Sequence, residues 1–493
     1  MKRAPGHAVL AVTAGYFLVM FAVSPVSVVL PSLADSLGVK VDTASWVMTA
    51  YLLPLTACLL PAGRLGDIVG HRRIFVMGLV LTAVTAFGAG LATDLWQLLA
   101  ARALQGVGAA LVSAASLPII TATVEDSRRG RAIALTTMSS TLGAMAGTAL
   151  APAFVQYLNW RWAFFTGGAA GMVALILAAR MGQGVQQPSR ARLDWAGAVL
   201  LLLTLSVASL SLNHFHEGPE TFADGWTWHL PMHLATALLL AMFVLVETRV
   251  RHPLIRFDQL RHGPFTTAVT ANGVLHMTMM MATFAIPFLI QRGMGLSAVE
   301  TGVLLVAMQA CTVAVSLVAG AVYDRTRWAW LCPLAMTMVA GGLTVLGLAA
   351  TSLQFEHSLV AMIWLGTGSG AFMTTNNTRI MGSLAAEYRG FASGMLETTR
   401  QYGHTLGVTI AAAGLATALG AGLPSGVQPE AVRAGFGHAA FLMGLIAWLG
   451  VALAAYPLYA HRIPWPSFAP APRVSGPAGR EVALAPAVAG EGD

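Results

Sequence analysis

The stretch "PAGRLGDIVGHRR", residues 61–73, places a dense group of charges between two long apolar runs. It holds three arginines, one histidine and a single carboxylate, Asp67, among the glycines Gly63, Gly66 and Gly70. Glycine permits tight backbone paths, and a carboxylate can pair with arginines or cap a following helix. One apolar run ends near Gly63 and the next begins near Ile74, so the stretch predicts a short charged turn between two helices.

Composition places those helices in a membrane. Of 493 residues, 56% are hydrophobic and 10% are charged, whereas a soluble domain carries roughly a quarter charged residues. A membrane-spanning helix needs about 20 mostly apolar residues, and its backbone groups must be paired within the segment. The sequence contains fourteen such runs, which predict an all-α polytopic membrane protein with spans at 8–30, 44–63, 74–93, 97–121, 132–156, 163–180, 194–212, 230–247, 265–290, 300–323, 329–350, 358–383, 390–421 and 435–458.

The arginines set the expected orientation. If the chain starts inside, the segments between spans that face inward hold most of the arginines, and the outer segments hold only Lys40, Arg161, Arg292 and Arg433. The positive-inside rule then puts both termini in the cytoplasm. This bias also accounts for the net charge of +7, so we expect no nucleic-acid partner. Residues 461–493 are rich in Pro, Ala and Gly without periodicity, which predicts a disordered cytoplasmic tail.

The glycine spacing around Asp67 carries a family resemblance. "GRLGDIVGHRR" resembles motif A of the major facilitator superfamily, through Gly63, Leu65, Asp67, Gly70, Arg72 and Arg73, with Ile68 in place of the usual arginine. In that family the motif latches the two halves of the transporter during its conformational cycle. A weaker echo, "GAVYDRTR" at 320–327, adds Asp324 to the expected latch.

Further stretches resemble one branch of that family, the fourteen-span drug:proton antiporters, which export quaternary ammonium compounds and antibiotics. They are "WVMTAYLLPLTACLLPAGRLGD", "AARALQGVGAA", "NWRWAFF", "LDWAGAVLLLL" and "RGFASGMLETTRQYGHTLGV". The resemblance implies an N-terminal six-helix bundle at 1–181, two inserted helices at 182–262 and a C-terminal six-helix bundle at 263–460. The two bundles are expected to alternate access to a cavity between them.

The driving force is expected to be an ion gradient. The only lysines, Lys2 and Lys40, do not follow a glycine, so the chain lacks the P-loop of an ATP-driven pump. Ionisable groups inside a membrane are costly and are functional candidates by default. Glu397 lies about two turns into its span, with Arg400 three residues on. We expect Glu397 to carry the proton; the alternative is a permanent ion pair with Arg400 that holds the bundle.

Arg102 is the second membrane charge, and it matches the arginine of the family's motif B, which is associated with proton transfer. Such a cation can lower the pKa of a partner carboxylate in one state and release it in another. The alternative is that Arg102 snorkels to the cytoplasmic face. His276 and His404 are candidate proton relays, with packing through hydrogen bonds as the alternative.

Two departures weaken the resemblance. In the first span, "FAVSPVSVVLP" puts Ala22 where the family has an aspartate and Ser27 where it has an asparagine. In the fifth span, "GAMAGTALAP" keeps Gly143 and Gly147 of the antiporter motif C but replaces its proline with Thr148. These changes leave the direction and coupling of transport open.

The substrate is expected to be an amphiphilic organic molecule, cationic if Glu397 faces the cavity. Candidate cavity residues are Gln309, His276, Asn376 and Asn377, although the two asparagines can instead bridge helices near the cytoplasmic end. A methionine-rich stretch at 277–281 beside Phe284 suits an adaptable surface, a packed core or a lipid-facing stripe.

The expected function is therefore proton-coupled export by a monomer in the bacterial inner membrane, with protons, a small molecule and the lipid bilayer as partners. No cofactor or metal is expected, because His214, His216 and Glu217 lie in one outer loop without ligand spacing. The alternatives are a uniporter or symporter of a small metabolite and, from another class, a membrane-embedded enzyme. The enzyme would need acids, histidines or a nucleophile gathered at one face, and the sequence shows none gathered.

Overall fold

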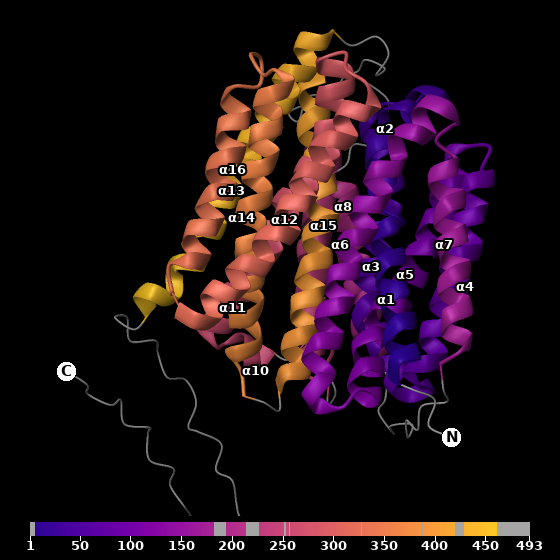
Figure 1. The fold of residues 1–493 in the computed structure, drawn as a ribbon, viewed down its shortest axis with the longest axis vertical. Helices are drawn as coiled ribbons and strands as arrows, with labels where there is room; N and C mark the ends of the chain where they lie inside the picture. Colours follow the sequence, from indigo (N-terminus) through magenta and orange to yellow (C-terminus); the bar gives the residue numbers. More distant parts are fainter. Residues whose placement is uncertain are drawn as a thin grey trace, which may run out of the picture.

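The computed structural model describes residues 5–181, 194–212, 226–250, 253–255, 257–326, 328–385, 388–419 and 428–460, and these residues form helices and no strand. The predicted tail at 461–493 and the loop with His214, His216 and Glu217 lie outside them. Figure 1 shows two groups of helices side by side, one drawn in indigo and magenta and the other in orange and yellow. The start of the first helix and the end of the last lie at the same end of the molecule, which we call the inner end.

The N-terminal bundle consists of α1 to α7. Helix α3 packs on α5, α4 packs on α5 and α7, and α1 packs on α6. The bounds of these helices are α1 Pro5–Phe21, α2 Ser24–Leu37, α3 Val41–Val69, α4 His71–Leu91, α5 Leu95–Thr123, α6 Asp126–Tyr157 and α7 Trp162–Ala179.

The C-terminal bundle consists of α11 to α16, in which α12 packs on α14, α11 on α15 and α13 on α16. Its bounds are α11 Gly263–Phe288, continued by the π-helix η1 Leu289–Gly293, then α12 Ala298–Thr326, α13 Leu331–Leu348, α14 Phe355–Gly382, α15 Arg389–Leu419 and α16 Pro429–Ala460. Between the bundles in sequence, α8 Trp195–Leu212 packs on α9 Trp226–Glu247, and α10 is the short segment Phe257–Leu260.

Every predicted apolar run overlaps helical residues of the described chain, and the first run overlaps two helices, α1 and α2. Eleven of the described helical stretches are long and apolar enough to cross a membrane. Helix α8 is a shorter apolar helix, and α14 and α15 fall outside the eleven because glycines, amides, hydroxyls and charges interrupt their apolar runs. The all-helical membrane fold is confirmed, and the count of fourteen spans stays a prediction.

The first run is divided at Ala22 and Val23 into α1 and α2. Pro25 stands in the first turn of α2 and has no N–H to donate to the preceding turn. The Val26 amide bonds to the Val23 carbonyl instead of continuing the ladder, so the Ala22 carbonyl is released from helical pairing. This break becomes important for Arg102.

The prediction of a charged turn between Gly63 and Ile74 is wrong. Helix α3 continues to Val69, and α4 begins at His71, so the change of direction occurs at Gly70 alone. Gly70 has φ +104°, a conformation that a Cβ atom opposes. Nothing between Gly63 and Val69 breaks a helix, and these residues therefore extend α3 beyond its apolar run.

The two bundles meet where α3 lies against α15 and α6 lies against α12. At mid-height the Thr56 hydroxyl of α3 and the Thr405 hydroxyl of α15 are 2.9 Å apart. At the outer end, opposite the inner end, Gln291 Nε2 donates to the Val28 carbonyl at 3.1 Å. The helices thus position a polar zone on α15 beside the N-terminal bundle.

Candidate functional site

Glu397 and Arg400 form an ion pair on α15. Arg400 Nη2 lies 2.7 Å from Glu397 Oε1 and 2.6 Å from Oε2. The side chain of Arg400 is only 10% exposed and that of Glu397 only 12%, so water screens the pair weakly. The predicted (i, i+3) pairing is therefore present, while the role of Glu397 as proton carrier stays a prediction.

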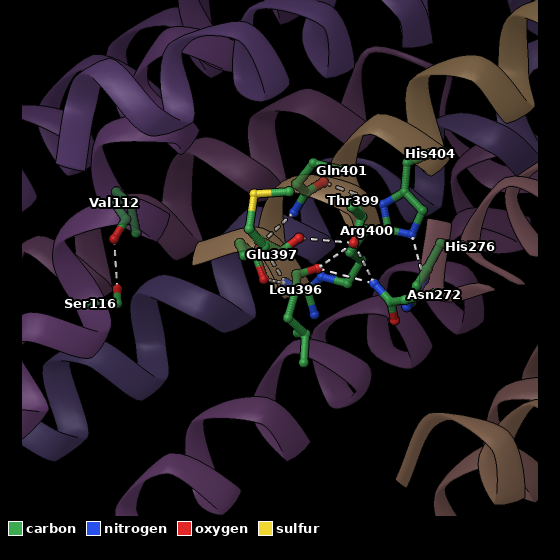
Figure 2. Close-up of polar contacts among 11 residues, drawn as sticks. Val112, Ser116, Asn272, His276, Leu396, Glu397, Thr399, Arg400, Gln401 and His404 are labelled. Atoms are coloured by element: carbon green, nitrogen blue, oxygen red, sulfur yellow. Dashed lines mark hydrogen bonds and ion pairs between the residues drawn. The ribbon is translucent and has the colours of Figure 1, made fainter. Parts of the chain in front are cut away.

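A chain of hydrogen bonds continues from this pair along α15. Gln401 Nε2 donates to Glu397 Oε1 at 2.8 Å, and Gln401 Oε1 lies 3.3 Å from His404 Nδ1. His404 Nε2 in turn lies 3.1 Å from Nδ1 of His276 on α11, with the two rings edge-on at 76°. Figure 2 shows these side chains converging between the two helices. We call Glu397, Arg400, Gln401, His404 and His276 the polar chain.

Glycines explain how α11 and α15 approach closely enough for this contact. A Cβ atom at Gly403 would lie 2.4 Å from the Gly273 carbonyl oxygen, and one at Gly407 would lie 2.4 Å from that of Met277. Small residues four apart allow helix backbones to touch in membranes. Asn272 of α11 adds bonds from Nδ2 to the Leu396 carbonyl at 3.1 Å and to Thr399 Oγ1 at 3.0 Å. The sequence spacing of Gly403 and Gly407 carries this signal.

Tyr16 of α1, in the other bundle, is an electrostatic neighbour of the polar chain. Its side chain is within electrostatic range of both Glu397 and Arg400, and its residue is almost fully buried. Thr405, next to His404, donates to the Gln401 carbonyl at 3.1 Å and also meets Thr56 of α3. The polar chain therefore lies where the two bundles touch. Sequence reasoning did not identify Tyr16, because it lies in an apolar run without a motif.

Arg102 is placed differently from the expectation. It lies in the outer part of α5, is fully buried, and so does not snorkel to the cytoplasmic face. Its Nε donates to the Val47 carbonyl at 2.9 Å, and its Nη1 donates to the Ala22 carbonyl at 3.1 Å and to Gln105 Oε1 at 2.7 Å. Among the described residues it contacts no carboxylate. The expected carboxylate partner is absent in this state, and Arg102 is not brought together with Glu397.

Two aromatic rings complete the surroundings of Arg102. Its guanidinium carbon lies 4.3 Å from the ring centre of Tyr51 and 5.7 Å from that of Phe164. Rings and carbonyls together accept a cation that no carboxylate neutralises. The break between α1 and α2 supplies one of those carbonyls, at Ala22, the position where the family has an acid.

The predicted cavity residues separate into different environments. Gln309 of α12 bridges the bundles, with its Nε2 3.4 Å from Thr148 Oγ1 of α6, the residue that replaces the motif C proline. Asn376 is fully buried and donates to the Ala268 carbonyl at 2.9 Å, so it bridges α14 and α11 and does not line a cavity. Asn377 is half-buried. Met280, Met281 and Phe284 belong to the buried core, which agrees with the packed-core alternative for the methionine-rich stretch.

A pocket of about 420 Å³ lies between the bundles at the outer end, and its lining includes Asp35, Pro152, Gln291 and Arg292. None of the four predicted cavity residues lines it. Asp35 and Arg292 form an ion pair there. Sequence reasoning treated Arg292 only as one of the few outer arginines. The sequence signal for this residue is its position. Arg292 lies at the outer end of the first helix of its bundle, and Asp35 lies at the corresponding place in the other bundle.

The expected latch is compact at the inner end of α3. Asp67 Oδ1 lies 3.1 Å from His71 Nε2, and Asp67 Oδ2 lies 3.7 Å from Arg64 Nη1. A Cβ at Gly66 would lie 2.2 Å from the His71 ring, so this glycine lets the ring fold back on α3. Arg72 and Arg73 have no described ion pair with Asp67, and the side chain of Asp324 lies outside the described residues. Leu65 packs on the core.

No described cluster of His, Cys, Asp or Glu could hold a metal ion. The three cysteines are free thiols; Cys332 is buried and Cys58 and Cys311 are half-buried. The chemistry of the described site is therefore that of an ion pair, two imidazoles and hydrogen bonds across a bundle interface.

Known proteins resemble the chain along most of its length. The chain is 29% identical over 412 residues to the uncharacterised transporter YebQ of Escherichia coli strain K12, covering 82% of this chain and 88% of that protein. It is 31% identical over 423 residues to the cephamycin export protein CmcT of Amycolatopsis lactamdurans, covering 82% and 83%. Other relatives are named as multidrug or antibiotic resistance transporters, and none of these names is that of an enzyme.

Solved structures agree on the fold. A bacterial homologue of the human lysosomal transporter Spinster, in an inward-facing and unoccupied conformation, matches with a TM-score of 0.65 at 14% identity, over 92% of this chain and 97% of that one. The family model of the Major Facilitator Superfamily matches residues 12–408. Together with the helical bundles described above, this match places the chain in the major facilitator superfamily, a family of membrane transporters.

Proposed function

We propose that the protein is a proton-coupled exporter of amphiphilic organic compounds, a member of the fourteen-span drug:proton antiporter branch that works as a monomer in the bacterial inner membrane. The observation that carries the proposal is the buried Glu397–Arg400 pair on α15, which lies within electrostatic range of Tyr16 of the opposite bundle. Relatives named for cephamycin export, multidrug transport and puromycin resistance support the substrate class.

The coupling follows from competition for one carboxylate. In the described state Arg400 forms an ion pair with Glu397. A proton arriving from outside neutralises Glu397 and releases Arg400, whereas a cationic group of the substrate stabilises the ionised form. Because an unpaired charge is costly at this depth, the carboxylate binds either the proton or a cation. Exchange of one for the other as the bundles alternate access gives antiport.

The test is uptake of ethidium, a lipophilic fluorescent cation, by inverted membrane vesicles under an imposed gradient that is acidic inside. We expect accumulation by the wild type and loss of the gradient-driven part in Glu397→Gln. Glu356→Gln is the matched control, because this substitution makes the same chemical change at an exposed position of the same bundle. Full gradient-driven accumulation in Glu397→Gln would remove Glu397 from the mechanism.

A second candidate function is facilitated transport of a small metabolite without proton exchange. It is favoured by Ala22, where the family's acid is missing and where this residue offers Arg102 only its backbone carbonyl. In the same vesicles such a protein would move its substrate down the substrate's own concentration gradient. Uptake by the wild type would then be unchanged by a proton gradient of either direction.

A further inference from the structure

We propose that the His276–His404 pair is a second proton-binding site, which shares one transported proton with Glu397. The inference rests on the proposed proton coupling and names two further residues for it. The pair lies at mid-height between α11 and α15, within two turns of Glu397, and it is joined to Glu397 through Gln401.

The hydrogen-bond directions follow from the ionised carboxylate. Glu397 only accepts, so the Gln401 amide donates to it and Gln401 Oε1 is left as an acceptor. His404 must then carry its proton on Nδ1 to reach Gln401, and its Nε2 accepts from Nδ1–H of His276. These tautomers are assigned from the network. They leave a lone pair on His276 Nε2, to which none of the described residues donates.

Protonation at His276 Nε2 therefore forms one new N–H bond and breaks none of the four contacts in the chain. Protonation at His404 Nε2 instead places two N–H groups against each other. The pair consequently has room for one added proton and not two, and His276 is its acceptor.

Charge links the pair to Glu397. Among the described residues, Arg400 acts electrostatically on both imidazoles, and His404 also acts on His276. Tyr16 of α1 and Glu397 act on the pair through Arg400, which interacts with both. While Glu397 is ionised it offsets part of the charge of Arg400, so an imidazolium costs less there than beside an uncompensated guanidinium. Once Glu397 is protonated, Arg400 is uncompensated and repels a second positive charge. The polar chain thus holds one proton at a time.

The first test reads the imidazoles directly, without a substrate. The full chain, labelled with ¹⁵N-histidine in lipid nanodiscs, is titrated by NMR, with His276→Asn and His404→Asn used to assign signals. We expect Nδ1–H tautomers for both residues in alkaline solution and uptake of one proton by the pair on acidification. Glu397→Gln keeps the acceptor for Gln401 but removes the charge. In this variant, proton uptake by the histidine pair should occur at a pH about one unit lower.

His438, exposed on α16 of the same bundle, is the internal control and should titrate identically in wild type and Glu397→Gln. Nε2–H tautomers, two protons taken up independently, or a titration that Glu397→Gln leaves unchanged would each overturn the proposal. None of these outcomes depends on whether ethidium is transported, so this proposal can fail while Glu397 remains the carrier.

The second test uses transport. The pH range over which gradient-driven ethidium uptake occurs should be narrower in His276→Asn and His404→Asn than in the wild type. In His438→Asn the pH profile should keep its shape. Profiles of the two variants that superimpose on the wild type would contradict a role for the pair. Loss of uptake in Glu397→Gln with unchanged histidine variants would leave the proposed function intact and reject this inference alone.

Discussion

Asp35 of α2 and Arg292 of η1 form an ion pair that joins the two bundles at their outer ends. Arg292 also lies 3.5 Å from the Pro31 carbonyl, and its neighbour Gln291 donates to the Val28 carbonyl. Contacts of this kind must separate when the outer side opens, because they bridge the surfaces that move apart.

Asp35→Asn should therefore favour the outward-open state. The pair is partly exposed, so its loss is expected to cost at most about 1 kcal/mol, roughly a five-fold change in the ratio of the two states. Spin labels at Ser36 and Val299, both exposed at the outer end, would report a larger population at long distance. Arg292→Gln should act in the same direction, and the double variant should add little. An unchanged distance distribution in both single variants would show that the pair does not hold the outer side closed.

Arg102 is expected to be a structural residue and not a proton carrier in this state. Arg102→Ala leaves the carbonyls of Val47 and Ala22 without their donor and opens a cavity beside Tyr51. Leaving buried acceptors without their donor costs about 1–3 kcal/mol, which would lower the unfolding temperature measured by fluorescence-detected size exclusion.

Arg102→Lys is the informative comparison. A lysine keeps the charge but cannot reproduce the geometry of the guanidinium fork, so stability should fall while the pH profile of transport keeps its shape. A shifted pH profile in a stable Arg102→Lys protein would return Arg102 to the coupling mechanism.

The approach of α11 to α15 can be tested with one methyl group. In Gly403→Ala the new Cβ would meet the Gly273 carbonyl oxygen at 2.4 Å. The helices must separate, at a cost of about 1–3 kcal/mol, and the contact between His276 and His404 should lengthen. Gly394→Ala, on the same helix with no atom within 4 Å of the added Cβ, should be neutral or slightly stabilising. Equal unfolding temperatures for the two variants would contradict the close packing.

The bend between α3 and α4 depends on Gly70. An alanine there would have to adopt φ +104°, at a cost of about 1–3 kcal/mol. We expect Gly70→Ala to lower both stability and transport, because the contact between Asp67 and His71 spans the bend. Gly88→Ala in α4, where the added Cβ meets nothing within 4 Å, is the matched control. Wild-type behaviour of Gly70→Ala would show that the bend tolerates a side chain.

The sequence predicts most of the helices because apolar runs of this length have few alternatives in a membrane. It fails at the inner end of α3, because hydropathy marks where lipid ends and not where a helix ends. The glycine at position 70 is the residue that decides the boundary, and its φ is not visible in composition.

The polar site was predictable in part. Glu397 and Arg400 pair through helical spacing, which a sequence reveals directly. The contact of His276 with His404 joins residues 128 apart in the chain, and the bonds of Arg102 depend on a carbonyl freed by a break in another helix. Such contacts follow from packing in three dimensions, for which the only local signs are Gly403, Gly407 and Pro25.

The hydroxyl contact between Thr56 and Thr405 lies near the middle of both α3 and α15. At 1.5 Å per residue, each helix extends roughly 20 Å from this contact in either direction. A contact at mid-height moves least when the two bundles tilt against each other, and either hydroxyl can donate, so this bond can persist through the motion. All members of the polar chain belong to the C-terminal bundle. A bound proton would therefore move with that bundle, while the surface that it faces, from Tyr16 to the solvent at either end, changes.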